Sequence, residues 1–376
     1  MTGIRILADD LTGALDTAAA FSGRVPVYID CPPDTPGAGI DSPVSVVATA
    51  TRDVPVEAMP ALLSPVVGWF TSGSLSFKKV DSLLRGNTFD EVAWLYRQGR
   101  FGKAIFAPAF PAQGRVTLND RQWIVRPGGV REAVASPLRA AFEKSGLQAG
   151  PQRDERVAVW IPEVVTDDDL DRVVLQGASN DASVMWIGSA GLGNALARRF
   201  GLSPQPGNAS ALDVGVGPTV LVSASFQPVF REQWTLLGSA RAVRGVAEAG
   251  DAAQIDEAIG RARAGDKEVW FDLSPRETVS PAQATSLLKT NTEMLVAQLP
   301  KPGQLVVVGG DTLLGLCRAS GAAGLLAHPS IRPGWGCARL MGGAWDGVPC
   351  YSRSGAFGTA DDLVALYGAL RHTTSC

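Results

Sequence analysis

The chain has 376 residues, of which 45% are hydrophobic and 19% charged, and its formal net charge at pH 7 is −3. This balance is typical of a folded globular protein and excludes an extended disordered chain. Without a basic excess, a large nucleic-acid-binding surface is not expected. No apolar run reaches the roughly 20 residues of a membrane span. The length predicts two or three domains.

Cysteine and histidine limit the chemistry that is available. The five cysteines form no C-x-x-C pair, so neither a disulfide framework nor a cysteine zinc site is expected, and reduced thiols favour the cytoplasm. With only His328 and His372, an H-E-x-x-H metalloprotease is excluded. The first apolar run is broken by Asp9 and Asp10, so it does not read as a signal peptide.

The first half alternates short apolar runs with helical patterns. A helix is expected after the first run, from about residue 10 to a stop at Gly23, and another over 192–199. The predicted strands are 4–8, 25–29, 44–48, 76–80, 104–107, 157–161 and 184–187. Strands that alternate with helices indicate βαβ units and a mainly parallel sheet.

The second half repeats this plan after a stretch rich in proline and glycine. Residues 204–218 are predicted to link one domain, 1–203, to another, 219–376. Strands are expected over 219–223, 268–273 and 305–308, and helices over 230–237, 251–264, 281–298, 312–318 and 361–370. The predicted fold class is therefore α/β, with two domains that each contain a mainly parallel sheet flanked by helices.

Charged side chains gather where the predicted strands of the first half end. Ligands of open α/β sheets bind at these carboxyl ends. The charged residues there are Asp9, Asp10, Arg52, Lys78, Lys79, Asp81 and Arg85. Arginine forks bind carboxylates, and carboxylates accept hydroxyl hydrogen bonds or help to hold Mg²⁺. The pattern favours a site for a small polyhydroxylated anion. The alternative is that each charge faces solvent or caps a helix, with Asp9 or Asp10 as an N-cap.

Small residues take these positions in the second half. Glycines after a strand let backbone amides approach a phosphate, and a helix N-terminus supplies further N–H donors. The candidate phosphate-binding residues are Ser223, Ser225, Gly309, Gly310, Asp311, Thr312 and Gly355. The alternative for each short motif is a tight turn without a ligand. No G-x-x-x-x-G-K-[ST] motif is present, so a Walker-type loop is excluded.

Six stretches of the chain, in order, resemble the four-carbon acid sugar kinase family. They span nearly the whole chain, and the first two are the most specific. They are ADDLTGALD at 8–16, KKVDSLLRGN at 78–87, PAFPAQGR at 108–115, GSAGL at 188–192, GGDT at 309–312 and SGAFG at 354–358.

The resemblance implies an N-terminal substrate domain, a C-terminal ATP domain and phosphorylation of the terminal hydroxyl of threonate, erythronate or an oxo-tetronate with ATP and Mg²⁺. It implies that Asp10, Arg52 and residues 81–85 contact the acid sugar. It implies that Ser223 or Ser225, residues 309–312 and Gly355 contact ATP. Lys79 or Arg115 could balance the charge of the transferred phosphoryl group, with a purely structural role as the alternative for either. The candidate substrate-binding residues are thus Asp10, Arg52, Lys79, Asp81, Ser82, Leu83, Leu84 and Arg85.

Roles within this set are expectations of different kinds. Asp10, with Asp9 in reserve, is expected to accept the hydroxyl proton, and Arg85 with Arg52 to hold the substrate carboxylate. Asp311 is expected to cap a helix rather than to assist Mg²⁺. Metal ligands are otherwise left open.

Several residues depart from the family pattern, most of them in the ATP half. Leu83, Ala224, Arg353 and Ala356 stand where the family has threonine, glycine, lysine and asparagine. These departures leave open a non-catalytic sugar-acid or nucleotide sensor of the same fold. An NAD(P) dehydrogenase is disfavoured because no G-x-G-x-x-G follows the first strand. The identity of the acid is open, as is the oligomeric state, for which a homodimer is one alternative.

Overall fold

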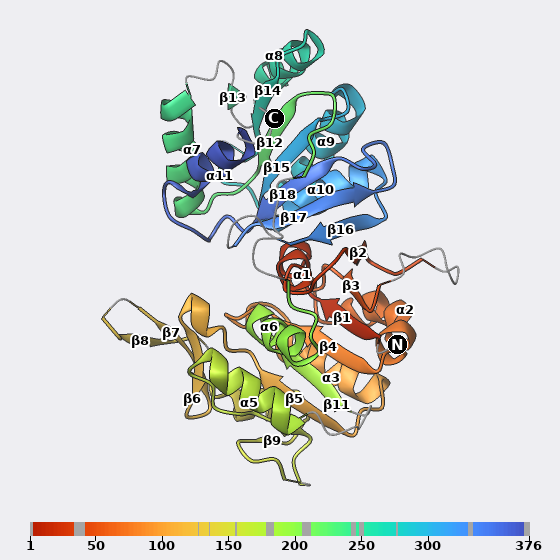
Figure 1. The fold of residues 1–376 in the computed structure, drawn as a ribbon, viewed down its shortest axis with the longest axis vertical. Helices are drawn as coiled ribbons and strands as arrows, with labels where there is room; N and C mark the ends of the chain where they lie inside the picture. Colours follow the sequence, from red (N-terminus) through yellow and green to blue (C-terminus); the bar gives the residue numbers. More distant parts are fainter. Residues whose placement is uncertain are drawn as a thin grey trace. The chain divides into compact units, whose positions relative to one another are not determined.

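The computed structural model describes residues 3–33, 42–126, 128–134, 136–154, 156–177, 184–204, 212–241, 246–247, 252–275, 277–329 and 334–371. The chain divides into two compact units, Met1–Gln205 and Pro206–Cys376. Both contain helices and strands, so the predicted α/β class is confirmed (Figure 1). No helix of the described ranges is long and apolar enough to cross a membrane.

The first unit is built on a parallel sheet with the strand order β2-β3-β1-β4-β11-β5-β10-β9. Its strands are β1 (Ile4–Ala8), β2 (Val25–Ile29), β3 (Val44–Ala48), β4 (Leu75–Lys79), β5 (Lys103–Ala107), β9 (Ala149–Gly150), β10 (Val159–Trp160) and β11 (Val184–Gly188). Every residue of β2, β3, β4 and β11 is buried. These strands are therefore covered on both faces, as their apolar runs predict.

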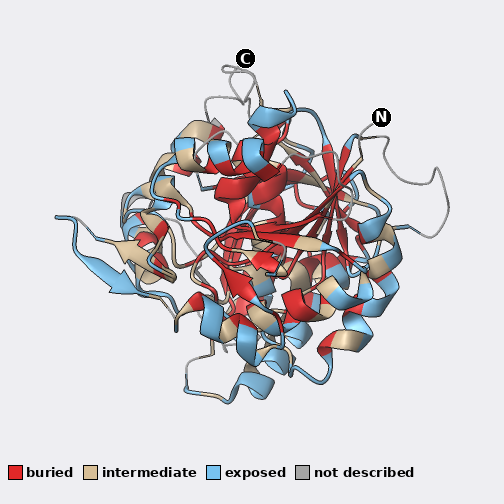
Figure 2. Cartoon of the chain, turned by 90° about the horizontal axis from the view of Figure 1, so that it is seen from below, coloured by how far each residue is buried: buried red, intermediate tan, exposed pale blue. Residues whose placement is uncertain are grey.

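Helices form a layer on each face of this sheet. They are α1 (Leu11–Ala18), α2 (Met59–Thr71), α3 (Thr88–Gln98), α4 (Leu138–Lys144), α5 (Asp167–Gly177) and α6 (Ala190–Arg199), with a short 3₁₀ turn η1 (Pro111–Gln113). Helix α6 packs against α1 and α5, and α3 packs against α2 and α4 (Figure 1). Figure 2 shows the buried residues gathered in the strands between these layers. The sequence analysis missed α2, α3 and α4; in α2, Pro65 and Gly68 interrupt the helical pattern.

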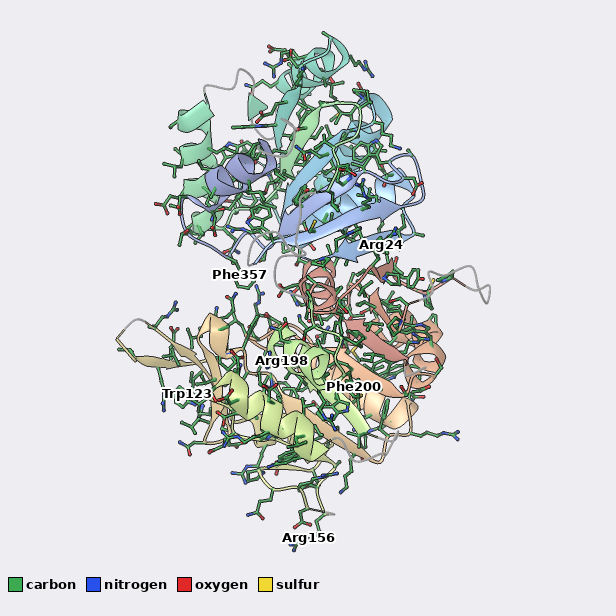
Figure 3. All side chains as sticks on the ribbon, viewed as in Figure 1. Arg24, Trp123, Arg156, Arg198, Phe200 and Phe357 are labelled. Atoms are coloured by element: carbon green, nitrogen blue, oxygen red, sulfur yellow. The ribbon has the colours of Figure 1, made fainter. Side chains whose placement is uncertain are left out.

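A second, antiparallel sheet in the first unit was not predicted. It contains β6 (Arg115–Leu118), β7 (Arg121–Val125) and β8 (Arg131–Ala133) in the order β6-β7-β8. Strands β6 and β7 are joined by Asn119 and Asp120, which both have positive φ. Positive φ at both residues is typical of the two-residue type I′ hairpin turn. Trp123 of β7 is labelled in Figure 3.

The second unit also contains a mainly parallel sheet, with the order β13-β14-β12-β15-β18-β17-β16. Its strands are β12 (Thr219–Ser223), β13 (Val246–Ala247), β14 (Glu268–Asp272), β15 (Gln304–Val308), β16 (Gly324–His328), β17 (Gly336–Met341) and β18 (Pro349–Arg353). Strand β17 runs antiparallel to both of its neighbours. The sequence analysis did not predict β16, β17 or β18, because antiparallel strands can follow one another without an intervening helix.

Helices cover both faces of this sheet as well. They are α7 (Pro228–Arg241), α8 (Ala252–Arg263), α9 (Pro281–Gln298), α10 (Gly310–Ser320) and α11 (Asp362–Arg371). Helix α7 packs against α11, and α9 packs against α10 (Figure 1). The core between them includes Leu221, Phe230, Trp270, Trp335 and Tyr351, all buried. Each unit therefore has a hydrophobic core of its own.

Candidate functional site

Most of the charged residues predicted at the strand ends of the first unit lie together. Strands β3 and β4 both pair with β1, with Ala48 and Lys79 opposite Ala8, so the three strands end at one edge of the sheet. Asp9 and Asp10 directly follow β1, Arg52 lies just beyond β3, and Lys79 ends β4. The topology thus gathers residues that are far apart in the sequence.

Arg52 connects the two carboxylates that follow β1. Its Nε and Nη2 donate to the two oxygens of Asp9, each at 2.9 Å, and Nη2 also donates to Asp10 Oδ1 at 2.6 Å. Burial alone would lower the pKa of Arg52, but the charges of Asp9 and Asp10 raise it. The guanidinium is therefore a permanent positive charge whose fork is occupied mainly by Asp9.

Asp10 is also the N-cap of α1. Its Oδ1 accepts the backbone N–H of Gly13 at 3.2 Å, and its Oδ2 accepts the hydroxyl of Thr12 at 2.7 Å. Burial alone would raise the pKa of Asp10, but Arg52, Lys79 and these hydrogen bonds together lower it. Helix capping and participation in the charged cluster were alternatives in the sequence analysis, and Asp10 does both.

The turn after β4 carries the next group of predicted residues. Arg85 Nε donates to Asp81 Oδ2, and Leu84 N donates to Asp81 O at 2.9 Å. Burial would raise the pKa of Asp81, but the hydrogen bond from Arg85 and the charge of Arg52 lower it. The side chain of Arg85 is 46% exposed, so it remains open to a ligand.

The interior of this turn is shaped by backbone geometry. Ser82 and Leu84 are buried, Leu83 is partly exposed, and Leu84 has a φ of 54°. Gly86 has a φ of 74°, and a Cβ there would collide with the backbone of Arg52. The close approach of this turn to Arg52 therefore requires glycine.

Lys79 is a buried cation in the middle of the cluster. The residue is 5% exposed, and its Nζ lies beside Gly13 and Asp10 Oδ1. Its charge acts on Asp10, Asp16 and Asp81. Within the described residues, its ammonium group makes neither a hydrogen bond nor an ion pair within 4.0 Å. A buried ammonium group without such a partner is suited to an anionic ligand.

Lys78 lies on the other side of the sheet. Adjacent residues of a strand point to opposite faces, and Lys78 is fully buried with its Nζ 2.6 Å from Glu91 Oε1. The same oxygen of Glu91 accepts the hydroxyl of Thr51 at 2.8 Å. This buried pair supports the segment that carries Arg52. The sequence analysis grouped Lys78 with the strand-end charges and missed Glu91, although the alternation of residues along the strand separates the two lysines.

Gln122 of β7 is a second supporting residue that the sequence analysis missed. It is fully buried, and its Nε2 lies 3.0 Å from Ser82 O and 3.3 Å from Pro108 O. Its Oε1 accepts the hydroxyl of Thr117 at 2.7 Å. The antiparallel sheet is thereby bonded to the turn that carries Asp81 and Arg85.

The residues predicted to bind phosphate also converge, in the second unit. Ser223, Val308 and Arg353 lie in register at the ends of the neighbouring parallel strands β12, β15 and β18. Ser223 Oγ donates to Val308 O at 2.7 Å and accepts Ser225 N at 3.1 Å. Ala224 N donates to Thr312 Oγ1 at 3.2 Å. One strand edge therefore holds the serine loop and the start of α10 together.

Helix α10 begins one residue earlier than the expected cap. Its N-cap is Gly309, at a φ of 115°, and Gly310 opens the helix. The expectation that Asp311 caps the helix is wrong: Asp311 lies exposed in the first turn. The positive φ of Gly309 is a backbone conformation that residues with a Cβ atom rarely adopt. A glycine cap leaves the helix terminus without a capping side chain, as a phosphate site requires.

Gly355 completes this group of residues. A Cβ at Gly355 would collide with Ser225 Oγ, and Gly309 N donates to Arg353 O at 2.9 Å. Ser223, Ser225, Gly309, Thr312 and Gly355 therefore belong to one connected group of segments.

Two arginines that could meet a phosphate are engaged within the protein. Arg353 is buried, pairs with Asp362 at 2.8 Å and Gln233 Oε1 at 2.7 Å, and its guanidinium lies 4.8 Å from the centre of the Trp335 ring. Arg231 pairs with Asp272 at 2.5 Å. Arg353, which replaces the lysine of the family pattern, thus organises the loop that follows it and contains Gly355. The sequence analysis did not single out Arg231.

The described residues contain no group of three or more His, Cys, Asp or Glu side chains that could hold a metal ion. A magnesium ion commonly uses one or two carboxylates together with the phosphates of a nucleotide.

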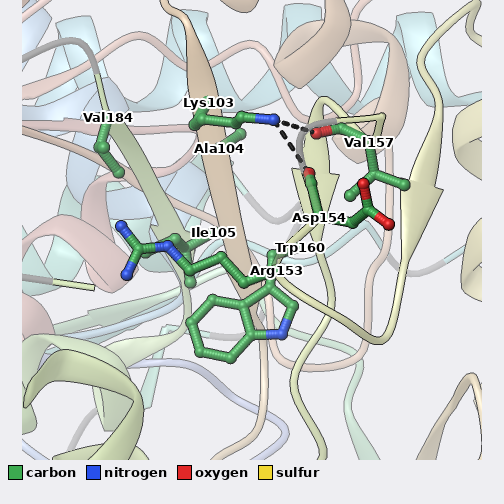
Figure 4. A pocket seen from close by; sticks show the side chains of 8 residues that line it. All are labelled: Lys103, Ala104, Ile105, Arg153, Asp154, Val157, Trp160 and Val184. Atoms are coloured by element: carbon green, nitrogen blue, oxygen red, sulfur yellow. Dashed lines mark hydrogen bonds between the residues drawn. The ribbon is translucent and has the colours of Figure 1, made fainter. Parts of the chain in front are cut away.

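A small hollow lies elsewhere in the first unit, and Figure 4 shows its lining. It is formed at Lys103 and Val184, the first residues of β5 and β11, with Arg153 and Trp160 beside them. Lys103 Nζ donates to two backbone carbonyl groups there, at 2.9 and 3.0 Å. The hollow is at the amino ends of the strands, opposite the edge that carries the charged cluster.

Comparisons with known proteins find relatives along the chain. Residues 4–139 match the family model described as a sugar-binding N-terminal domain. The chain is 28% identical to a D-threonate kinase of Cupriavidus necator, with 97% of each chain covered. It is 24% identical to a D-erythronate kinase of Heliobacterium modesticaldum, with 96% of this chain and 95% of the relative covered.

Solved structures share the fold. A protein of Salmonella typhimurium LT2 superposes with a TM-score of 0.75 at 18% identity, and a Haemophilus influenzae protein of the DUF1537 family with a TM-score of 0.71 at 17% identity. In each case 97% of this chain and 99% of the solved chain are covered. The architecture of both units is therefore that of these proteins.

Proposed function

The chain belongs to the four-carbon acid sugar kinase family, and on that premise we propose that it transfers the γ-phosphoryl group of ATP to the terminal hydroxyl of a four-carbon sugar acid. Relatives named as D-threonate and D-erythronate kinases along nearly the whole chain support the reaction class. Threonate, erythronate and their oxo derivatives are the candidate substrates.

The first unit binds the sugar acid in this proposal. Arg85 is the partly exposed arginine of the cluster and can turn its fork toward the substrate carboxylate. Asp10 and Asp81, both held ionised by neighbouring cations, can accept hydrogen bonds from substrate hydroxyls. Lys79 supplies a buried positive charge without a fixed partner among the described residues. This cluster at the ends of β1, β3 and β4 is the observation that carries the proposal.

The second unit binds ATP in this proposal. The N-terminus of α10, with Gly309 and Gly310, offers backbone N–H groups to the phosphates. Ser225 and Gly355 form the adjoining surface, and Mg²⁺ bound to the nucleotide neutralises phosphate charge. Phosphoryl transfer depends chiefly on positioning and on charge stabilisation, so this division between binding surfaces suits the reaction.

ADP release from Mg²⁺-ATP tests the proposal against a panel of acids. The panel contains D- and L-threonate, D- and L-erythronate and their oxo derivatives, with five-carbon acids as controls. We expect turnover of a four-carbon acid and, in Arg85→Ala, a KM for that acid raised by about tenfold or more, because a charge-assisted contact contributes about 1.5–3 kcal/mol. Arg126→Ala is the matched control, since Arg126 pairs with Glu132 and both side chains are exposed.

Two results would contradict the kinase proposal. One is ATP binding without ADP release in the presence of every acid of the panel, which would favour the non-catalytic sensor. The other is equal loss in Arg85→Ala and Arg126→Ala, which would remove the charged cluster from substrate binding.

A further inference from the structure

The carboxylates nearest the strand ends are already engaged by other groups. Asp9 receives both arms of the Arg52 fork. Asp10 accepts hydrogen bonds from Arg52, Thr12 and Gly13. Asp81 accepts from Arg85. A carboxylate that accepts a proton during the reaction needs a free oxygen and a pKa that is not strongly lowered. The expectation that Asp10 accepts the proton is still a prediction, and these contacts count against it.

Asp16 differs from these three residues. It is exposed, and among the described residues its carboxylate has neither a hydrogen bond nor an ion pair within 4.0 Å. Helix α1 buries Leu11, Ala14 and Leu15 on its inner face. Thr12, Gly13 and Asp16 form the more open face. Because residues three and four apart share a helix face, Asp16 follows Gly13 along the face that begins at the Asp10 cap.

Lys79 links Asp16 to the charged cluster. Its buried Nζ lies against Gly13, the glycine that precedes Asp16 on the open face of α1. The charge of Lys79 acts on Asp10 and on Asp16. The open face of α1 thus presents an unpaired carboxylate near an ammonium group that makes no hydrogen bond within the described residues. Together they provide a proton acceptor near a site for negative charge.

We propose, on the basis of the kinase function proposed above, that Asp16 accepts the proton of the sugar-acid hydroxyl as this oxygen attacks ATP. The hydroxyl oxygen forms a bond to the γ-phosphorus, and the bond from that phosphorus to the oxygen bridging it to the β-phosphate breaks. ADP leaves with the electron pair of the broken bond. The proton ends on a carboxylate oxygen of Asp16, and Asp10 keeps its role as helix cap and Arg52 partner.

The electrostatic surroundings of Asp16 favour this role. The pKa of Asp16 is raised from its ordinary value: the protein atoms around this solvent-accessible carboxylate raise it, the charge of Lys79 lowers it, and the charge of Asp10 raises it further. A raised pKa makes a carboxylate a better proton acceptor near neutral pH.

Other charges on the elements packed against α1 have partners elsewhere. Arg5 of β1 donates to Ser45, Lys78 of β4 pairs with Glu91, and Arg198 of α6 pairs with Asp171. Strands β2 and β3 contain no Asp, Glu, Lys, Arg or His, and Arg199 of α6 is exposed. Lys79 and Asp10 are therefore the charges that set the ionisation of Asp16.

The test compares Asp16→Asn with the wild-type enzyme at saturating ATP and sugar acid. We expect kcat to fall by about 100-fold or more, the usual contribution of a positioned general base, with little change in KM for either substrate. The ionisation of ATP affects kcat of both enzymes equally, so its effect cancels in the ratio of wild-type kcat to variant kcat. This ratio is expected to decrease toward one as the pH falls and Asp16 takes up a proton.

Two further variants separate proton transfer from structure. Asp16→Ala leaves a space that formate can enter, and added formate is expected to restore part of its kcat. Asp168→Asn, an exposed aspartate in the first turn of α5, is the matched control and is expected to retain wild-type kcat without any response to formate.

A kcat for Asp16→Asn within about threefold of wild type would overturn the inference, as would a loss confined to KM or a kcat ratio independent of pH. Absence of turnover in the wild type would overturn the kinase proposal and this inference together. An active wild type beside an unchanged Asp16→Asn would overturn only the inference.

Discussion

At the scale of single residues, the charged side chains of the first unit differ in how they are hydrogen-bonded. Arg52 donates two hydrogen bonds to Asp9 and one to Asp10, whereas Lys79 lies beside Asp10 without a hydrogen bond to it. The close approach of Lys79 depends on Gly13, because any side chain there would occupy the space of Lys79 Nζ and Asp10 Oδ1. Gly13 is thus a requirement of the charged cluster rather than of the helix.

Gly13→Ala is therefore expected to disturb the site although alanine favours a helix. Displacement of Lys79 and Asp10 should lower kcat/KM for the sugar acid by about 100-fold, the typical effect of misplacing a group by about 1 Å. Steady-state kinetics with the acid identified above measures this change.

Gly68→Ala is the matched control, because Gly68 lies exposed in α2 and a Cβ there would meet no atom within 4 Å. This variant is expected to keep full activity and to gain about 0.5–1 kcal/mol in the free energy of unfolding. Equal activity in the two variants would show that Lys79 and Asp10 tolerate the added methyl group.

At the scale of elements, the antiparallel sheet of the first unit supports the site without supplying any of the charged residues of the cluster. Gln122 of β7 bonds to Ser82 O and Pro108 O, so the sheet holds the turn that carries Asp81 and Arg85. By contrast β8 is exposed at every residue, which agrees with its place at the edge of the sheet (Figure 2). The element therefore combines a buried supporting strand with an exposed outer strand.

Gln122→Leu should destabilise the first unit and weaken binding of the acid. The change leaves two buried carbonyl groups and the Thr117 hydroxyl without this partner, which costs about 1–3 kcal/mol for each unsatisfied group. Urea unfolding and the KM for the acid measure the two effects. In the exposed strand, Arg131→Ala is expected to change stability by about 0.5 kcal/mol at most. A Gln122→Leu variant as stable as Arg131→Ala would contradict the supporting role.

At the scale of the whole molecule, two units each enclose a core and carry one set of strand-end residues. Each core is built from the strands and helices of its own unit. Each unit therefore has the compact core that is typical of an independent domain. In our proposal, the first binds the acid and the second the nucleotide.

Residues 1–205 and 206–376, produced separately, are expected to unfold cooperatively and to bind different ligands. At about 100 times its dissociation constant, a ligand stabilises the unit that binds it by about 2.7 kcal/mol. ATP should therefore raise the thermal midpoint of the second unit, the sugar acid that of the first, and neither unit alone should release ADP. Stabilisation of the first unit by ATP would contradict the assignment.

The sequence by itself determined the α/β class, the repeated strand–helix plan of the two halves and the family. Apolar runs and their period indicate the class and the strand–helix plan, because the spacing of apolar residues shows which face of a strand or helix is buried. The stretches 8–16 and 78–87 also identified most of the charged cluster. The β6–β8 sheet and the strands β16–β18 were not predicted, because antiparallel strands with short connections have no helical pattern between them.

Only the tertiary structure decided which charge pairs with which. Lys78 and Lys79 are neighbours in sequence, yet one is buried against Glu91 and the other lies at the site, because successive residues of a strand point to opposite faces. The pairing of Arg52 with Asp9 depends on strands that are adjacent in space but distant in the chain. Long-range contacts of this kind fix the ionisation of each group, and the sequence does not state them.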